Sequence, residues 1–170
     1  MSKKLRLLAI LAVLAVLSSF TQAGAQAPPT TPAPPPLPYG APIGVDDAKK
    51  AAAAAVEEVK KIGAAPNAIA IVDHGGFLIY FERMDNTQLG SVEIAIDKAR
   101  SAALFRRPSK VFEDAVAGGR TAILALRGAI PIDGGLPLVS GGKIVGAIGA
   151  SGGTAQQDGQ VAKAGADTIK

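Results

Sequence analysis

The chain has 170 residues, of which 48% are hydrophobic, 4% aromatic and 19% charged, which suits one folded domain with tails and excludes a wholly disordered chain. It contains no Cys and one His, which excludes disulfides, thiolate metal sites and any site built from two His of one subunit. The formal net charge of +4 includes three basic residues near the N-terminus and is therefore a weak argument for a nucleic-acid partner.

Residues 1–25 have the three-part order of a secretory signal peptide. A basic start precedes the apolar run 7–17, and polar and small residues follow it. The basic residues are Lys3, Lys4 and Arg6. The apolar run is short for a membrane span, and the small residues favour cleavage after Ala25 or Ala27. We expect export to the periplasm or the extracellular space, no integral membrane span in the mature chain, and no nucleic-acid partner, because 15 basic and 14 acidic residues remain.

A proline-rich segment follows at residues 26–42. Residues 28–42 contain eight of the twelve prolines of the chain, and proline fixes φ and removes backbone donors. The composition is typical of an extended spacer that tethers a domain, with a docking ligand as the alternative. We expect the folded domain to comprise residues 43–170.

The folded domain begins with a predicted helix and a predicted hairpin. Asp46 or Asp47 can cap the helix, and Gly63 ends it. Two β-rich runs, 68–72 and 77–81, flank a Gly-Gly turn and predict antiparallel strands. Because both runs are apolar on both sides, we expect helices to cover both faces of their sheet.

Two further helices are predicted in the middle of the chain. Ser91 can cap one that ends before Pro108, and Ser109 begins a shorter one that Gly118 ends. Residues 121–130 fit a helix and a strand equally well.

The C-terminal part predicts a second hairpin and a last helix. Its strands are 136–139 and 143–150, and Thr154 can cap the helix with Gln157 in the capping-box position. Gly149 inside the last strand indicates a close approach by a helix or a ligand. Hairpins with segregated helices predict an α+β fold whose antiparallel sheet has about five strands.

The segment Gly149–Gly153 fits the G-x-S-x-G pattern of a hydrolase nucleophile. The base of that motif follows the serine in the chain, and no His follows Ser151. We therefore predict that Ser151 is structural and assign no catalytic residue.

The same glycine-rich loop offers backbone amides before a helix, where a carboxylate can bind. With an Arg, it carries the rival hypothesis of an accessory protein or enzyme acting on a small 2-hydroxy or 2-oxo acid. Plain helix capping is the ordinary explanation of the loop, and a purely structural assembly module is a third hypothesis for the protein.

Several short motifs occur together in the order of one known family. They are Ile71-Val72-Asp73-x-Gly75-Gly76-x-Leu78, Arg83-Met84-Asp85, Lys98-Ala99-Arg100-Ser101, Gly134-Gly135-Leu136-Pro137, Gly146-Ala147-Ile148-Gly149-Ala150-Ser151-Gly152 and Gln157-Asp158. With them, the chain resembles the GlcG/HbpS family of haem-binding proteins. Because it carries a predicted export signal, the secreted HbpS-like branch is the best match in function.

The resemblance implies a profilin-like α+β fold, dimers or octameric assemblies, and a role in haem sensing or handling. It brings no secure catalytic activity, and the iron ligand varies between members. Independently, an Ala-rich first helix and strands that are apolar on both sides favour a homo-oligomer.

His74 is the candidate haem ligand and metal ligand. Imidazole is the commonest protein ligand of haem iron, and His74 lies in a glycine turn that a flat macrocycle can approach. An ordinary exposed turn histidine is the alternative. The other candidate haem-site residues are Tyr80 and Met84 as weaker iron ligands and Arg83, Arg106 and Arg107 as partners of the propionates.

Overall fold

The structure is a computed structural model that describes residues 35–170. The predicted signal peptide and most of the predicted spacer lie outside the described residues. Within residues 35–170, no helix is both long and apolar enough to cross a membrane.

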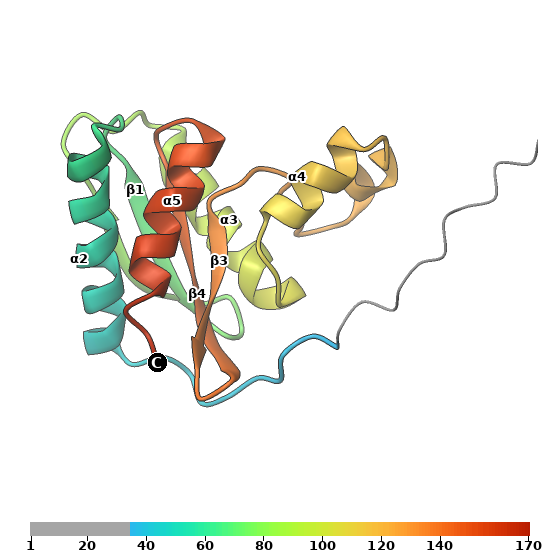
Figure 1. Cartoon of the computed structure of the whole chain (residues 1–170), viewed down its shortest axis with the longest axis horizontal. Coiled ribbons are helices and arrows are strands. Elements are labelled where there is room, and N and C mark those ends of the chain that lie inside the picture. Colours follow the sequence, from blue (N-terminus) through green and yellow to red (C-terminus); the bar gives the residue numbers. More distant parts are fainter. Residues whose placement is uncertain (1–34) are drawn as a thin grey trace, which may run out of the picture. The chain divides into compact units, whose positions relative to one another are not determined.

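Four antiparallel strands form one sheet in the order β2-β1-β4-β3 (Figure 1). The strands are β1 (Ala68–Asp73), β2 (Leu78–Arg83), β3 (Gly135–Ser140) and β4 (Lys143–Ser151). Both predicted hairpins are confirmed, and so is the α+β class with an antiparallel sheet. The sheet has four strands rather than about five, because residues 121–130 form the 3-10 helix η1 (Thr121–Ala125) and a loop.

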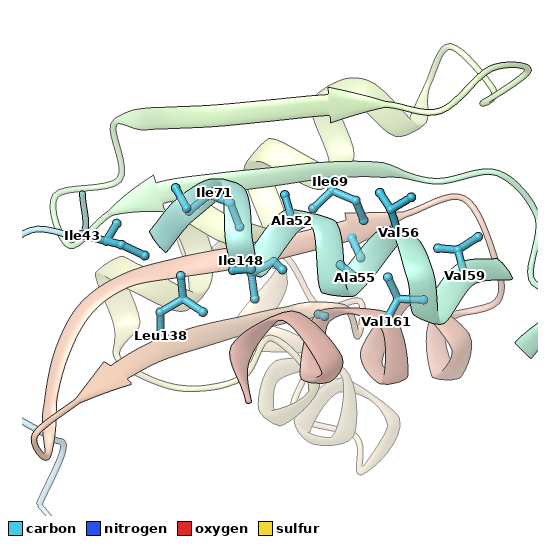
Figure 2. Close-up of a cluster of buried hydrophobic side chains, with 14 residues drawn as sticks. Ile43, Ala52, Ala55, Val56, Val59, Ile69, Ile71, Leu138, Ile148 and Val161 are labelled. Carbon is cyan, nitrogen blue, oxygen red and sulfur yellow. The ribbon is translucent and has the colours of Figure 1, made fainter. Parts of the chain in front are cut away.

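One face of the sheet packs against α2 (Val45–Ile62) and α5 (Ala155–Ala166), as Figure 2 shows. Ile69 and Ile71 of β1 alternate toward this face and meet the alanine and valine side of α2. Ile148 of β4 lies beside them. Burying each large aliphatic side chain contributes about 1.5–3 kcal/mol, so this cluster is the main core.

The other face packs against α3 (Ser91–Phe105) through small side chains such as Ala70 and Ala99. A Cβ on Gly149 would overlap the backbone of Ala95 in this helix. The close approach predicted at Gly149 is therefore that of a helix. The edge strand β2 is only partly covered, so the prediction of two covered faces is confirmed for β1 and wrong for β2.

The helix ends follow local rules with two corrections. Gly63 ends α2 in the left-handed conformation, and Thr154 and Gln157 form the predicted capping box of α5. Asp46 and Asp47 lie in the first turn of α2, where their negative charges interact favourably with the positive end of the helix dipole. Gly44 takes the N-cap position. Ser91 is the first residue of α3 rather than its cap, because its hydroxyl binds other side chains.

Helix α4 (Lys110–Ala117) and η1 extend away from the sheet (Figure 1). Gly118 ends α4 as predicted. Phe112 of α4 and Ile123 of η1 are buried, whereas Leu124 is 65% exposed. We call residues 110–126 the arm.

The end of the proline-rich segment is bound to the sheet. Pro38 O accepts from Ile144 N at 2.9 Å, and Gly40 N donates to Ile144 O at 2.8 Å. Ile43 N donates to Val145 O at 2.8 Å. The contact exists because the pairing of β1 with β4 stops at Gly146, so that the start of β4 pairs with β3 but has no partner in β1. We call residues 37–43 the strap. The packed structure thus begins several residues before the predicted domain boundary at residue 43.

Candidate functional site

His74 lies in the turn between β1 and β2, which Asp73 shapes. The Asp73 carboxylate accepts from Gly75 N at 2.8 Å and from Phe77 N at 2.9 Å. Gly76 has a φ of 85°, a conformation that favours glycine. The hydrogen bonds of Asp73 and the positive φ of Gly76 therefore define the conformation of the turn that carries His74.

The imidazole of His74 packs against the ring of Tyr39 in the strap. The two ring centroids are 5.6 Å apart with an interplanar angle of 44°. The Nδ1 atom of His74 is buried and has no hydrogen-bond partner among residues 35–170. A buried polar atom without a hydrogen-bond partner is uncommon in folded proteins.

Arg106 lies on the same tyrosine. Its guanidinium carbon is 5.3 Å from the centroid of the Tyr39 ring, and its Nη1 donates to Leu37 O at 3.3 Å. Arg106 ends α3 with a φ of 53°, which an L-residue adopts only at some cost. Of the predicted site residues, the structure thus brings His74 and Arg106 together through Tyr39.

The C-terminal half of α3 borders the same turn. Arg100 Nε donates to Gly76 O at 3.3 Å, and Leu104 packs beside Gly76. A hollow of about 300 Å³ lies next to Arg100 and Leu104, and the loop 128–130 forms its other side. Phe77 is 73% exposed and Leu104 is 50% exposed, so apolar surface and positive charge meet here.

We call this region the His74 surface. It comprises Tyr39, His74, Phe77, Arg100, Leu104 and Arg106. The sequence predicts His74 as the ligand, Arg106 as a propionate partner and Phe77 as an apolar neighbour of the ring. It does not single out Arg100, which stands in a family motif, or Tyr39, which lies in the proline-rich segment.

The remaining predicted residues lie elsewhere. Tyr80 donates to Glu82 Oε2 at 3.1 Å, and burial and this carboxylate raise the pKa of its phenol, which keeps the hydroxyl protonated. Met84 Sδ accepts from Asn67 N at 3.5 Å beyond the far end of β2. At about 3.3 Å per residue, β2 carries Met84 roughly 20 Å from the turn. Met84 is therefore unable to share an iron with His74 of the same subunit.

The two other predicted arginines are also apart from His74. Arg83 is exposed at the end of β2, opposite Ala68 of β1. Arg107 donates to Phe105 O at 3.0 Å, and its guanidinium carbon is 6.0 Å from the centroid of the Phe112 ring. Arg107 thus belongs to the base of the arm.

Two backbone amides of the glycine-rich loop before α5 are bound by side chains of that helix. Gly153 N donates to Asp158 Oδ1 at 2.9 Å, and Thr154 N donates to Gln157 Oε1 at 3.0 Å. Ser151 is buried and its hydroxyl donates to Ser91 Oγ at 3.3 Å. These two amides therefore belong to a helix cap and are not free to bind a carboxylate.

Ser151 and His74 lie at opposite ends of β1. Ser151 pairs with Ala68, the first residue of the strand, whereas His74 follows Asp73, the last. At about 3.3 Å per residue, the separation is on the order of 16 Å or more. Within one subunit, the imidazole is thus out of reach of the Ser151 hydroxyl.

Comparisons with known proteins give a consistent result. The family model described as "Haem degrading protein HbpS-like" matches residues 43–167. Protein GlcG of Escherichia coli K12 is 43% identical over 83 residues, which are 49% of this chain and 62% of GlcG. The match thus spans less than two thirds of that relative.

Two solved structures resemble the domain closely. One is a complex of PduOC with haem, with a TM-score of 0.69 and 28% identity over 76% of this chain and 96% of that one. The other is HbpS of Streptomyces reticuli in a double-mutant form, with a TM-score of 0.69 and 29% identity over 85% of this chain and 99% of that one.

Proposed function

The chain belongs to the HbpS-like family, and from that premise we propose that it is a haem-binding protein whose haem site is the His74 surface. The similarity to PduOC, which was solved with haem, supports the ligand. One observation carries the site: the only imidazole of the chain lies half-buried beside exposed apolar side chains and two guanidinium groups.

The residues of the His74 surface fit the chemistry of haem. Nε2 is the nitrogen through which His74 would bind iron, because Nδ1 is buried. Phe77 and Leu104 offer apolar contacts to a macrocycle, and Arg100 and Arg106 can pair with its propionates. Bound haem would supply a redox-active iron, which suits sensing or handling of haem. We therefore propose a role of this kind rather than catalysis by protein side chains.

Titration with haemin tests the proposal. We expect the absorbance of haemin in the Soret region to shift on mixing with the protein and to saturate at a fixed stoichiometry. A Soret band that stays at the position of free haemin throughout the titration would contradict haem binding.

We further propose that the protein is exported to the periplasm or the extracellular space. The basic, apolar and small-residue order of residues 1–27 supports this. Intact-mass analysis of the exported protein should give a chain that begins after Ala25 or Ala27, and a chain that still begins at Met1 would contradict it.

We also propose that the protein forms a homo-oligomer through the arm. The arm extends from the sheet (Figure 1). Its Leu124 and Leu126 are exposed. Exposed apolar side chains on an extended segment favour burial against another surface. A second copy of the chain can supply that surface.

A further inference from the structure

The strap carries two kinds of anchor that hold Tyr39 in place. Its backbone bonds to Ile144 and Val145 fix the chain on either side of the tyrosine. The Tyr39 hydroxyl is 3.0 Å from Ala103 O and 3.2 Å from Leu104 O at the end of α3. The ring is thus held against His74 from several directions, although Tyr39 is itself part of a proline-rich segment.

The buried Nδ1 restricts where the imidazole carries its proton. A neutral imidazole has one protonated and one bare nitrogen. If Nδ1 were protonated, a buried N–H would have no acceptor among residues 35–170, and orphaned buried N–H groups are rare in proteins. The geometry therefore favours the tautomer with the proton on Nε2.

This tautomer opposes ligation of iron. An imidazole binds a metal through a bare nitrogen, and ligating histidines usually donate the other N–H to a partner. In His74 the accessible nitrogen is the one that carries the proton. Ligation through Nε2 requires the proton to move to Nδ1, which is buried and has no acceptor among residues 35–170 while the ring of Tyr39 packs against the imidazole.

We propose that Tyr39 is a positioning residue that holds His74 in the non-ligating tautomer, so that binding of iron requires the strap to release. Release opens the ring of His74 to water, which can accept from Nδ1–H. The inference rests on the proposed function for its haem consequence, whereas the tautomer itself can be observed without haem. The strap, which joins the domain to the preceding part of the chain, would then control whether His74 can bind iron.

The single histidine makes a direct test possible. Tag-free protein labelled with ¹⁵N-histidine gives one pair of imidazole nitrogen signals in a long-range ¹H–¹⁵N spectrum, recorded near pH 8, where an ordinary imidazole is neutral. We expect a bare Nδ1 and a protonated Nε2 in the wild type, and a shift toward the other tautomer in Tyr39→Ala. A protonated Nδ1 in the wild type, or identical spectra for the two proteins, would overturn the proposal.

Haemin titration supplies the second readout. Tyr39→Ala should bind haemin about tenfold more tightly than the wild type, and the gain should vanish when His74→Ala is added. Tyr39→Phe keeps the ring but loses the hydroxyl anchors, and we expect a smaller gain. Equal or weaker binding by Tyr39→Ala would contradict control by the strap. If the tautomer changes as expected but neither protein binds haemin, the proposed function fails and the positioning of His74 by Tyr39 stands.

Discussion

Lys98 of α3 and Asp158 of α5 form a buried ion pair, with Nζ 2.7 Å from Oδ2 and side chains that are 1% and 4% exposed. The ammonium also donates to Ala150 O at 3.1 Å, and the carboxylate also accepts from Gly153 N. A Cβ on Gly134 would lie 2.8 Å from Lys98 Nζ. Four of the sequence motifs that mark the family thus meet at one end of the sheet, where they join α3 to α5.

Removing one partner of this buried ion pair should cost far more stability than removing one partner of an exposed pair. Lys98→Met should lower the free energy of unfolding by about 3–5 kcal/mol, because it leaves the Asp158 carboxylate buried without its counter-charge. Lys163→Met removes the exposed ion pair with Asp167 and should cost about 1 kcal/mol or less. Urea unfolding of both variants measures the difference. Equal losses would show that the buried pair contributes no more than a surface pair.

Ser151→Ala should leave a folded protein with no change in function. The hydroxyl donates to Ser91 Oγ in a buried position, so its loss should cost about 0.5–1.5 kcal/mol. Thermal unfolding and haemin titration provide the two measurements. If the wild type hydrolysed an ester and Ser151→Ala abolished that activity, the structural assignment of Ser151 would be wrong.

Asp133 should make stability depend on pH. Burial raises the pKa of its carboxyl above the usual 3.8, and the neighbouring Glu113 adds to the rise. A raised pKa in the folded state means that ionisation opposes folding, so this contribution is present below about pH 3.8 and is lost as the pH rises through the raised value.

Asp133→Asn removes that ionisation and can keep the hydrogen bond from Gly134 N. We therefore expect the variant to be more stable than the wild type at about pH 7, with the gain shrinking at about pH 3.5, below the usual pKa. Urea unfolding at the two pH values checks this. A gain of the same size at both values would refute the assignment to Asp133.

The arm predicts a specific effect on assembly. Leu124→Asp should shift the protein toward smaller species in light scattering at micromolar concentration, because a charge opposes burial of the arm. Leu89→Asp is the matched control, since Leu89 is 79% exposed and lies outside the arm. A monomeric wild type, or an equal effect of the two variants, would count against assembly through the arm.

Local signals in the sequence predicted most of the elements. The glycine turn after β1, the helix end at Gly63 and the capping box at Thr154 depend on a few adjacent residues, and the structure confirms each of them. The sequence of residues 121–130 does not distinguish a helix from a strand. The arm has few tertiary contacts, so its sequence carries no regular pattern of buried residues.

The parts that the sequence left open depend on distant contacts. Lys98 and Asp158 stood in separate motifs, and only the packing of α3 and α5 on the same sheet brings them together. Tyr39 lay in a segment whose prolines suggested a spacer, and its role depends on the start of β4 and the end of α3. Composition describes such a segment well but does not indicate which surface it binds.

The central claim is that His74 binds the iron of haem, and a comparison of two variants tests it most directly. Haemin titration of His74→Ala should show loss of the Soret shift and binding weakened roughly tenfold or more, about 1.4 kcal/mol. Met84→Leu changes a candidate ligand at the far end of β2 and should bind as the wild type does. An unchanged spectrum and affinity for His74→Ala would contradict the account and leave His74 as a residue of the turn.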